Sequence, residues 1–116
     1  MTPGAPLPEV RLVLITAPDT CVASALAERL VGEQLAACVN IVPGIRSVYR
    51  WEGKVQQDEE QLLLVKTTAD RFTELEQKVR EWHPYEVPEC MALPVVEGSR
   101  TYLEWVAAGC RPGQEA

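Results

Sequence analysis

The side chains that most often bind metals or perform catalysis in this chain of 116 residues are one histidine, four cysteines and 17 Asp and Glu residues. The single histidine, His83, opens the segment His83-Pro-Tyr-Glu-Val-Pro-Glu89, in which two prolines stiffen a loop that carries two carboxylates. An imidazole beside carboxylates and a thiol could bind a transition metal. The simpler alternative is a histidine that caps the end of a helix, where the helix dipole favours the charged imidazolium. The residues alone leave both interpretations open.

The four cysteines are Cys21, Cys38, Cys90 and Cys110. Their spacing is wide and contains no Cys-x-x-Cys pair, which argues against a zinc ribbon or a thioredoxin-type site. We expect each of them to be a buried, apolar free thiol. Cys38 and His83 could form a nucleophilic pair, but neither has an oxyanion-hole signature or a glycine-rich elbow beside it. The sequence therefore predicts a protein that is not an enzyme.

The acidic run Asp58-Glu59-Glu60 is the other concentration of possible ligands. In a strand, side chains alternate between the two faces, so Glu59 should point away from its two neighbours. Solvated strand surface is the simplest interpretation, and a divalent-cation site is the alternative. Lys66, between Val65 and Thr67, could pair with one of these carboxylates.

Composition and charge limit the classes of partner. The net charge is -6 at pH 7, which argues against nucleic acid and against anionic membranes, because both reward clustered Lys and Arg. No apolar run approaches the roughly 18 residues that a membrane span needs, and the start has no basic or apolar region typical of a secretory signal. We expect a cytoplasmic protein with one domain over residues 9–110, a disordered lead-in over 1–8 and a disordered tail over 111–116.

The elements that must position these residues follow from hydrophobic periodicity and turn signals. Thr67-Thr-Ala-Asp70 has the form of a capping box before the second helix. The predicted elements are a strand over 10–16, a helix over about 20–34, a strand over 38–51 interrupted at 43–44, a tight turn at 52–53, a strand from 54 or 55 to 65, a helix over 72–82, a strand over 90–96 and a helix after 99. This order, β-α-β-β-α-β with a terminal helix, predicts an α+β ferredoxin-like sandwich.

The predicted hairpin over residues 38–65 is too long for its own domain. An arm of about 14 residues would reach about 46 Å, whereas a compact domain of this size has a diameter of about 34 Å. The overshooting arms would leave unpaired backbone groups, and Tyr49 and Trp51 near the tip add aromatic area. We therefore expect an oligomer of closed symmetry. The alternative is that Pro43-Gly44 folds the arm back over its own sheet.

Taken together, several segments resemble the CutA divalent-cation tolerance family in both order and spacing. They are Thr16-Ala-Pro-Asp19, Leu35-Ala-Ala-Cys-Val-Asn40, Ser47-Val-Tyr-Arg-Trp-Glu-Gly-Lys54, Lys66-Thr-Thr68, His83-Pro-Tyr-Glu-Val-Pro-Glu89 and Tyr102-Leu-Glu-Trp105. The resemblance implies a ferredoxin-like homotrimer with a long second-to-third-strand hairpin, related in architecture to PII signal proteins. It also implies binding of Cu²⁺ or other divalent cations and a link to metal-ion tolerance, without an established enzymatic activity.

The resemblance also suggests where a site would lie. Bacterial members carry copper ligands at two positions that are Ile15 and Trp82 in this chain, so the cleft between subunits becomes the better candidate. It implies metal ligation by His83, Cys38 and Glu89, with the remaining cleft residues Trp51, Glu60, Lys66 and Tyr85 around them. The alternative is a PII-like signalling or scaffold trimer that binds a small molecule or a partner protein there, since a lysine beside Glu60 would suit an anionic ligand.

Overall fold

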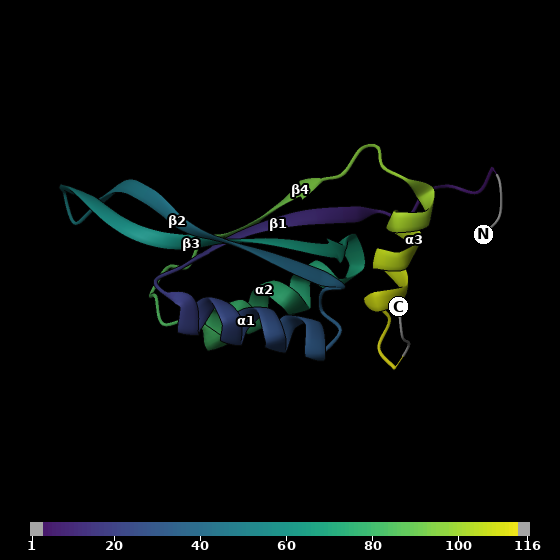
Figure 1. Ribbon diagram of the computed structural model, residues 1–116, viewed down its shortest axis with the longest axis horizontal. Helices are drawn as coiled ribbons and strands as arrows, with labels where there is room; N and C mark the ends of the chain where they lie inside the picture. The colour runs from purple at the N-terminus through teal and green to yellow at the C-terminus, as the bar shows by residue number, and fades with distance from the viewer. Residues whose placement is uncertain (1–3, 114–116) are drawn as a thin grey trace.

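The computed structural model describes residues 4–113, which form an α+β structure with a layer of helices on one side of a sheet (Figure 1). A four-stranded antiparallel sheet has the order β2-β3-β1-β4, which is the ferredoxin-like order expected from the sequence. Its elements are β1 (Val10–Ala17), α1 (Thr20–Gly32), β2 (Cys38–Trp51), β3 (Lys54–Thr68), the 3₁₀ turn η1 (Ala69–Arg71), α2 (Phe72–Trp82), β4 (Cys90–Pro94) and α3 (Arg100–Gly109). No helix in this described part of the chain combines the length and apolar character that crossing a bilayer requires.

The main core lies between the sheet and helices α1 and α2, which cover the same face (Figure 1). Alternate residues of β1 and β3 face the helices and are fully buried, among them Ile15, Leu63 and Val65. Helix α1 contributes Leu26 and Leu30 to the same cluster. This arrangement follows from the two periodicities in the sequence, because a strand buries every second residue and an amphipathic helix every third or fourth.

Several predicted features at the ends of elements differ from the structure, and β3 continues to Thr68 instead of residue 65. The Thr67-Thr-Ala-Asp70 capping box does not form: η1 precedes α2, the Thr68 hydroxyl donates to Asp70 at 2.6 Å, and no side chain caps α2. Helix α1 ends at Gly32 instead of residue 34, since Gln34 adopts a φ of 57°. Strand β4 ends at Pro94 instead of residue 96, because proline has no N–H to continue the ladder.

The hairpin extends beyond the rest of the sheet, as predicted. Strand β1 ends where Ala17 pairs with Gln61, so β2 and β3 pair only with each other from Glu60 to the tip. Glu52 and Gly53 both have positive φ, as a two-residue hairpin turn requires. The register shifts between Val42 and Ile45, which is a bulge and not a reversal, and the molecule measures 53 Å along its longest axis.

Residues just outside the regular elements are held by hydrogen bonds. The Arg100 guanidinium donates to the Ala5 carbonyl at 2.6 Å, and the Gln34 side-chain amide donates to the Arg111 carbonyl at 2.9 Å. The outer parts of the two expected disordered segments, residues 1–3 and 114–116, lie outside the described residues.

The sheet face opposite α1 and α2 is apolar over its centre. Figure 1 shows both helices on one side of the sheet, with α3 at the end of the sheet near the start of β1. Helix α3 packs on Val10, but Met91 and Leu93 of β4 remain 52% and 42% exposed. The other apolar residues of this open face, defined by alternation and register, are Leu12, Leu14, Val42, Leu62 and Leu64. The face continues into the extended hairpin, as a subunit interface would.

We expect Gly44→Ala to destabilise the protein by about 1–2 kcal/mol, because Gly44 has a φ of +73° and a Cβ is disfavoured there. Gly32→Ala is the matched control. Gly32 also has open space around it, but it lies at the end of α1 and has no positive φ, so this change should not lower the free energy of unfolding. Urea unfolding at one fixed protein concentration measures both. Equal unfolding free energies for the two variants would contradict a strained bulge.

Candidate functional site

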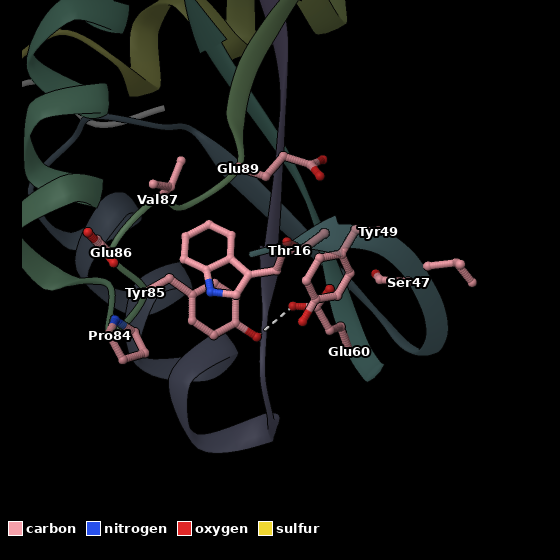
Figure 2. A pocket seen from close by; sticks show the side chains of 11 residues that line it. Thr16, Ser47, Tyr49, Glu60, Pro84, Tyr85, Glu86, Val87 and Glu89 are labelled. Atoms are coloured by element: carbon pink, nitrogen blue, oxygen red, sulfur yellow. Dashed lines mark hydrogen bonds between the residues drawn. The ribbon is translucent and has the colours of Figure 1, made fainter. Parts of the chain in front are cut away.

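A cleft of about 610 Å³ lies between the extended hairpin and the loop that joins α2 to β4 (Figure 2). Cavities of this volume are typical of small-ligand sites. Its lining residues are Thr16 from β1; Ser47, Val48, Tyr49 and Trp51 from β2; Glu60 from β3; and Pro84, Tyr85, Glu86, Val87 and Glu89 from the loop. None of these described lining residues carries a positive charge.

Glu60 is the buried carboxylate of this cleft. It pairs in register with Ile45 just past the β-bulge and is only 6% exposed, whereas its neighbour Glu59 points to the opposite face and is exposed. The expectation that the whole acidic run is solvated strand surface is therefore wrong for Glu60. The reason is tertiary: the loop after α2 covers this part of β3, and the Tyr85 hydroxyl donates to the Glu60 carboxylate at 2.7 Å (Figure 2).

Two tyrosines hold protons beside carboxylates in the cleft. Burial, together with the hydrogen bond to Glu60, raises the pKa of Tyr85 well above its ordinary value. A hydrogen bond to Asp58 raises the pKa of Tyr49 in the same way. Both phenols thus stay protonated at neutral pH and donate to anions. One oxygen of Glu60 accepts from Tyr85, and the other has no hydrogen-bond partner among the described residues.

His83 lies behind the cleft and positions Tyr85. The ring is only 6% exposed, its Nε2 lies 2.7 Å from the Thr16 carbonyl, and its Nδ1 accepts from the Tyr85 backbone N–H at 3.1 Å. A carbonyl can only accept and an N–H can only donate, so the ring is the neutral tautomer with hydrogen on Nε2. The backbone of His83 caps α2, as in the simpler interpretation, but the ring is not the imidazolium that the dipole of a helix C-terminus favours. Neither ring nitrogen retains a free lone pair for a metal.

The structure separates Cys38 and Lys66 from the cleft within one chain. These two residues pair with each other across β2 and β3, and Lys66 Nζ donates to the Asn40 side chain instead of a carboxylate of the acidic run. Lys66 lies six positions after Glu60 along β3, a separation of about 20 Å in an extended strand. Of the seven residues that the resemblance implied, Trp51, Glu60, Tyr85 and Glu89 line the cleft, and His83 supports it. Within residues 4–113, no three His, Cys, Asp or Glu side chains converge as a metal site.

The cysteines are free, but only Cys110 is buried as expected. Cys21 on α1 is exposed, because it lies on the face of the helix that points away from the sheet, while Cys110 is buried and Cys38 and Cys90 are half-buried. Burial, with help from Glu76 and Glu89, raises the pKa of Cys90 to about 11, so this thiol is a poor nucleophile at neutral pH.

Several lining residues were not proposed as site residues from the sequence, namely Thr16, Ser47, Val48, Pro84, Glu86 and Val87. Tyr49 was noted only as aromatic area for a subunit contact. Alternation after the bulge gives one usable signal, because Ser47, Tyr49 and Trp51 must share the face of Glu60 once Ile45 pairs with it. The contribution of Thr16 depends on the path of the loop across the end of β1, which no local pattern encodes.

The fold and the cleft define a class of protein. It is a ferredoxin-like chain in which a long β2–β3 hairpin extends beyond the sheet and forms a cleft with the α2–β4 loop. Residues 11–109 match the family model described as CutA1 divalent ion tolerance protein, so the chain belongs to this family. The Divalent-cation tolerance protein CutA of Thermus thermophilus is 57% identical over 95 residues, which cover 82% of this chain and 92% of that protein. The crystal structure of CutA1 from Oryza sativa has a TM-score of 0.88 at 46% identity and covers 90% of this chain and 96% of its own.

A plant relative shows that compartments vary. Protein CutA, chloroplastic, of Arabidopsis thaliana is 50% identical over 100 residues, which are 86% of this chain but only 55% of the plant protein. Its name places that protein in the chloroplast, so the cytoplasmic location expected for this chain stays a prediction.

Proposed function

We propose that this chain is a homotrimeric, non-enzymatic protein that binds divalent cations, Cu²⁺ among them, and acts in tolerance of metal ions. One observation carries the proposal: Glu60 is a nearly buried carboxylate with a free oxygen, in a cleft that contains two further carboxylates and no cationic side chain. Burying a charge is costly unless an opposite charge or hydrogen bonds compensate it. One phenol hydrogen bond leaves this carboxylate able to accept a cation.

The donor set fits a divalent cation, but a single chain does not complete the coordination. Glu60 and Glu89 offer oxygen ligands, which suit hard cations and are also used by copper and zinc. The ring of His83 is already engaged at both nitrogens, and Cys38 is remote from it within one chain. Ligands from a second copy, Cys38 included, or water would have to fill the remaining positions. This requirement supports the trimer, as does the open apolar sheet face.

We expect Glu60→Gln to weaken binding of Cu²⁺, Zn²⁺ or Mn²⁺ by about ten- to a hundredfold, since it removes the buried charge and keeps the shape. Isothermal titration calorimetry of the purified protein measures the affinity. Glu59→Gln is the matched control, because it removes the same charge from the adjacent residue on the opposite face and should leave affinity unchanged. Wild-type affinity in Glu60→Gln would rule out Glu60 as a ligand.

The volume of the cleft supports a second candidate, a PII-like trimer that binds a small molecule. A volume of about 610 Å³ exceeds what a metal ion needs and lies in the range of small-ligand pockets. The argument for an anionic ligand is weaker than the sequence suggested, because Lys66 does not lie beside Glu60 in one chain. A thermal-shift screen of anionic metabolites, run beside the metals, discriminates between the two candidates.

A further inference from the structure

The walls of the cleft combine aromatic rings with carboxylates, and this combination is characteristic of sites for organic cations. Three of the eleven lining residues are aromatic, Tyr49, Trp51 and Tyr85, and three are acidic, Glu60, Glu86 and Glu89. We propose that the cleft binds a free aliphatic diamine in its doubly protonated form, with one ammonium group on Glu60. This inference goes beyond the proposed metal binding and does not depend on it.

Glu60 provides the anchor for the first ammonium group. Its carboxylate is held in place, because Tyr85 donates to one oxygen at 2.7 Å and the neutral His83 ring fixes the backbone of Tyr85. The second oxygen is free to accept an N–H. A charge-assisted hydrogen bond in a largely buried site is stronger than one at the surface, and an ammonium group would neutralise the buried charge.

The aromatic rings distinguish an organic cation from a metal ion. Tyrosine and tryptophan faces attract ammonium groups through the ring quadrupole, and they also cover methylene groups. Trp51 and Tyr49 of the hairpin both line the cleft and are 43% and 41% exposed in the isolated chain. A hydrated metal ion makes no use of such surfaces, whereas the carbon chain of an amine buries against them.

The remaining carboxylates of the cleft indicate that the ligand carries a second positive charge. Glu60 lies on β3 and Glu89 directly before β4, and Figure 2 shows their side chains well apart, with the Tyr85 ring in the same view between the loop and Glu60. The lining has no basic side chain to balance Glu89 or Glu86. A ligand with charges at both ends of an apolar chain matches this pattern, and a cleft of about 610 Å³ has room for it.

Calorimetry with four probes tests the inference on the full chain in its native oligomeric state: putrescine, 1-butylamine, 1,4-butanediol and Cu²⁺. We expect putrescine to bind more tightly than butylamine and butanediol not to bind. Trp51→Leu should weaken putrescine binding by about three- to thirtyfold, because it removes an aromatic face from the cleft. Glu60→Gln should weaken the binding of both putrescine and Cu²⁺, and Glu59→Gln should weaken the binding of neither. Butanediol binding as well as putrescine, or wild-type putrescine affinity in Trp51→Leu and Glu60→Gln, would overturn the proposal.

Size-exclusion chromatography with light scattering shows whether Trp51→Leu preserves the assembly. If it does not, Tyr85→Leu replaces it, because Tyr85 lies on the loop and not on the hairpin. Putrescine binding that is lost in this variant supports the proposal, and binding that survives overturns it. If the wild-type protein binds putrescine but not Cu²⁺, the proposed metal function fails and this inference stands. If it binds Cu²⁺ but not putrescine, this inference fails and the metal function stands.

Discussion

Replacing His83 with alanine is expected to lower the free energy of unfolding by about 2–4 kcal/mol, although the residue lies in a loop. The change strips a buried carbonyl, that of Thr16, and the Tyr85 N–H of their partners, and each unsatisfied buried group costs about 1–3 kcal/mol. The Tyr85 ring also loses its contact with the imidazole, whose centroid lies 4.7 Å away. The loop should then release Tyr85 from Glu60 and weaken the cleft as a whole.

Denaturant unfolding at a fixed protein concentration measures this loss, and copper calorimetry on the same samples measures its effect on binding. Val87→Ala is a suitable control, because Val87 lies in the same loop but is largely exposed, so its unfolding free energy should change by no more than about 0.5 kcal/mol. If His83→Ala abolishes copper binding while stability stays at the wild-type value, then His83 is a ligand and not a support for Tyr85.

Leu64→Glu should convert the proposed homotrimer into monomers, so that the molar mass in solution falls to about one third of the wild-type value. Leu64 lies at the centre of the open sheet face, paired with Leu14 of β1 on one side and Asn40 of β2 on the other. A carboxylate there would be buried without a partner in the assembly. The free-energy cost of burying an unpaired charge would exceed the stabilisation that the subunit contact provides. Light scattering after size-exclusion chromatography measures the mass.

The control for this experiment carries the same substitution on the opposite side of the sheet. Val31 on α1 is a partly exposed apolar residue, and Val31→Glu should leave the mass unchanged. We also expect the Leu64→Glu monomer to lose metal affinity, because residues 4–113 of one chain bring no three His, Cys, Asp or Glu side chains together. A trimeric Leu64→Glu variant would show that the open face is not the interface.

Local patterns predicted most of the fold. The periodicity of 10–16 and 72–82 and the turn at Glu52-Gly53 are encoded by residues that contact their near neighbours in sequence. The start of α1 is equally local, because the Asp19 carboxylate accepts from the Val22 N–H at 2.9 Å. Where prediction failed locally, as at the expected capping box, a competing hydrogen bond from Thr68 to Asp70 and a 3₁₀ turn replaced the expected geometry.

The site was less predictable, because its contacts join residues far apart in the chain. The family resemblance implied Trp51, Glu60, Tyr85 and Glu89 for a cleft between subunits, and these four residues line a cleft within one chain. It also implied His83 as a ligand and Lys66 beside Glu60. The Nε2 atom of His83 is engaged by the Thr16 carbonyl, which lies 67 residues earlier in the chain. Lys66 lies on the same strand as Glu60, and an extended backbone keeps two such residues apart.

By itself, the sequence determined the order of the elements, the length of the hairpin and the residue types available to it, because these depend on side-chain alternation and turn chemistry. Only the tertiary structure decided that Glu60 is buried, that Tyr85 donates to it and that His83 holds Tyr85 in place. The physical reason is that burial and hydrogen-bond pairing are set by which distant segment covers a residue. For Glu60, the loop after α2 determines both.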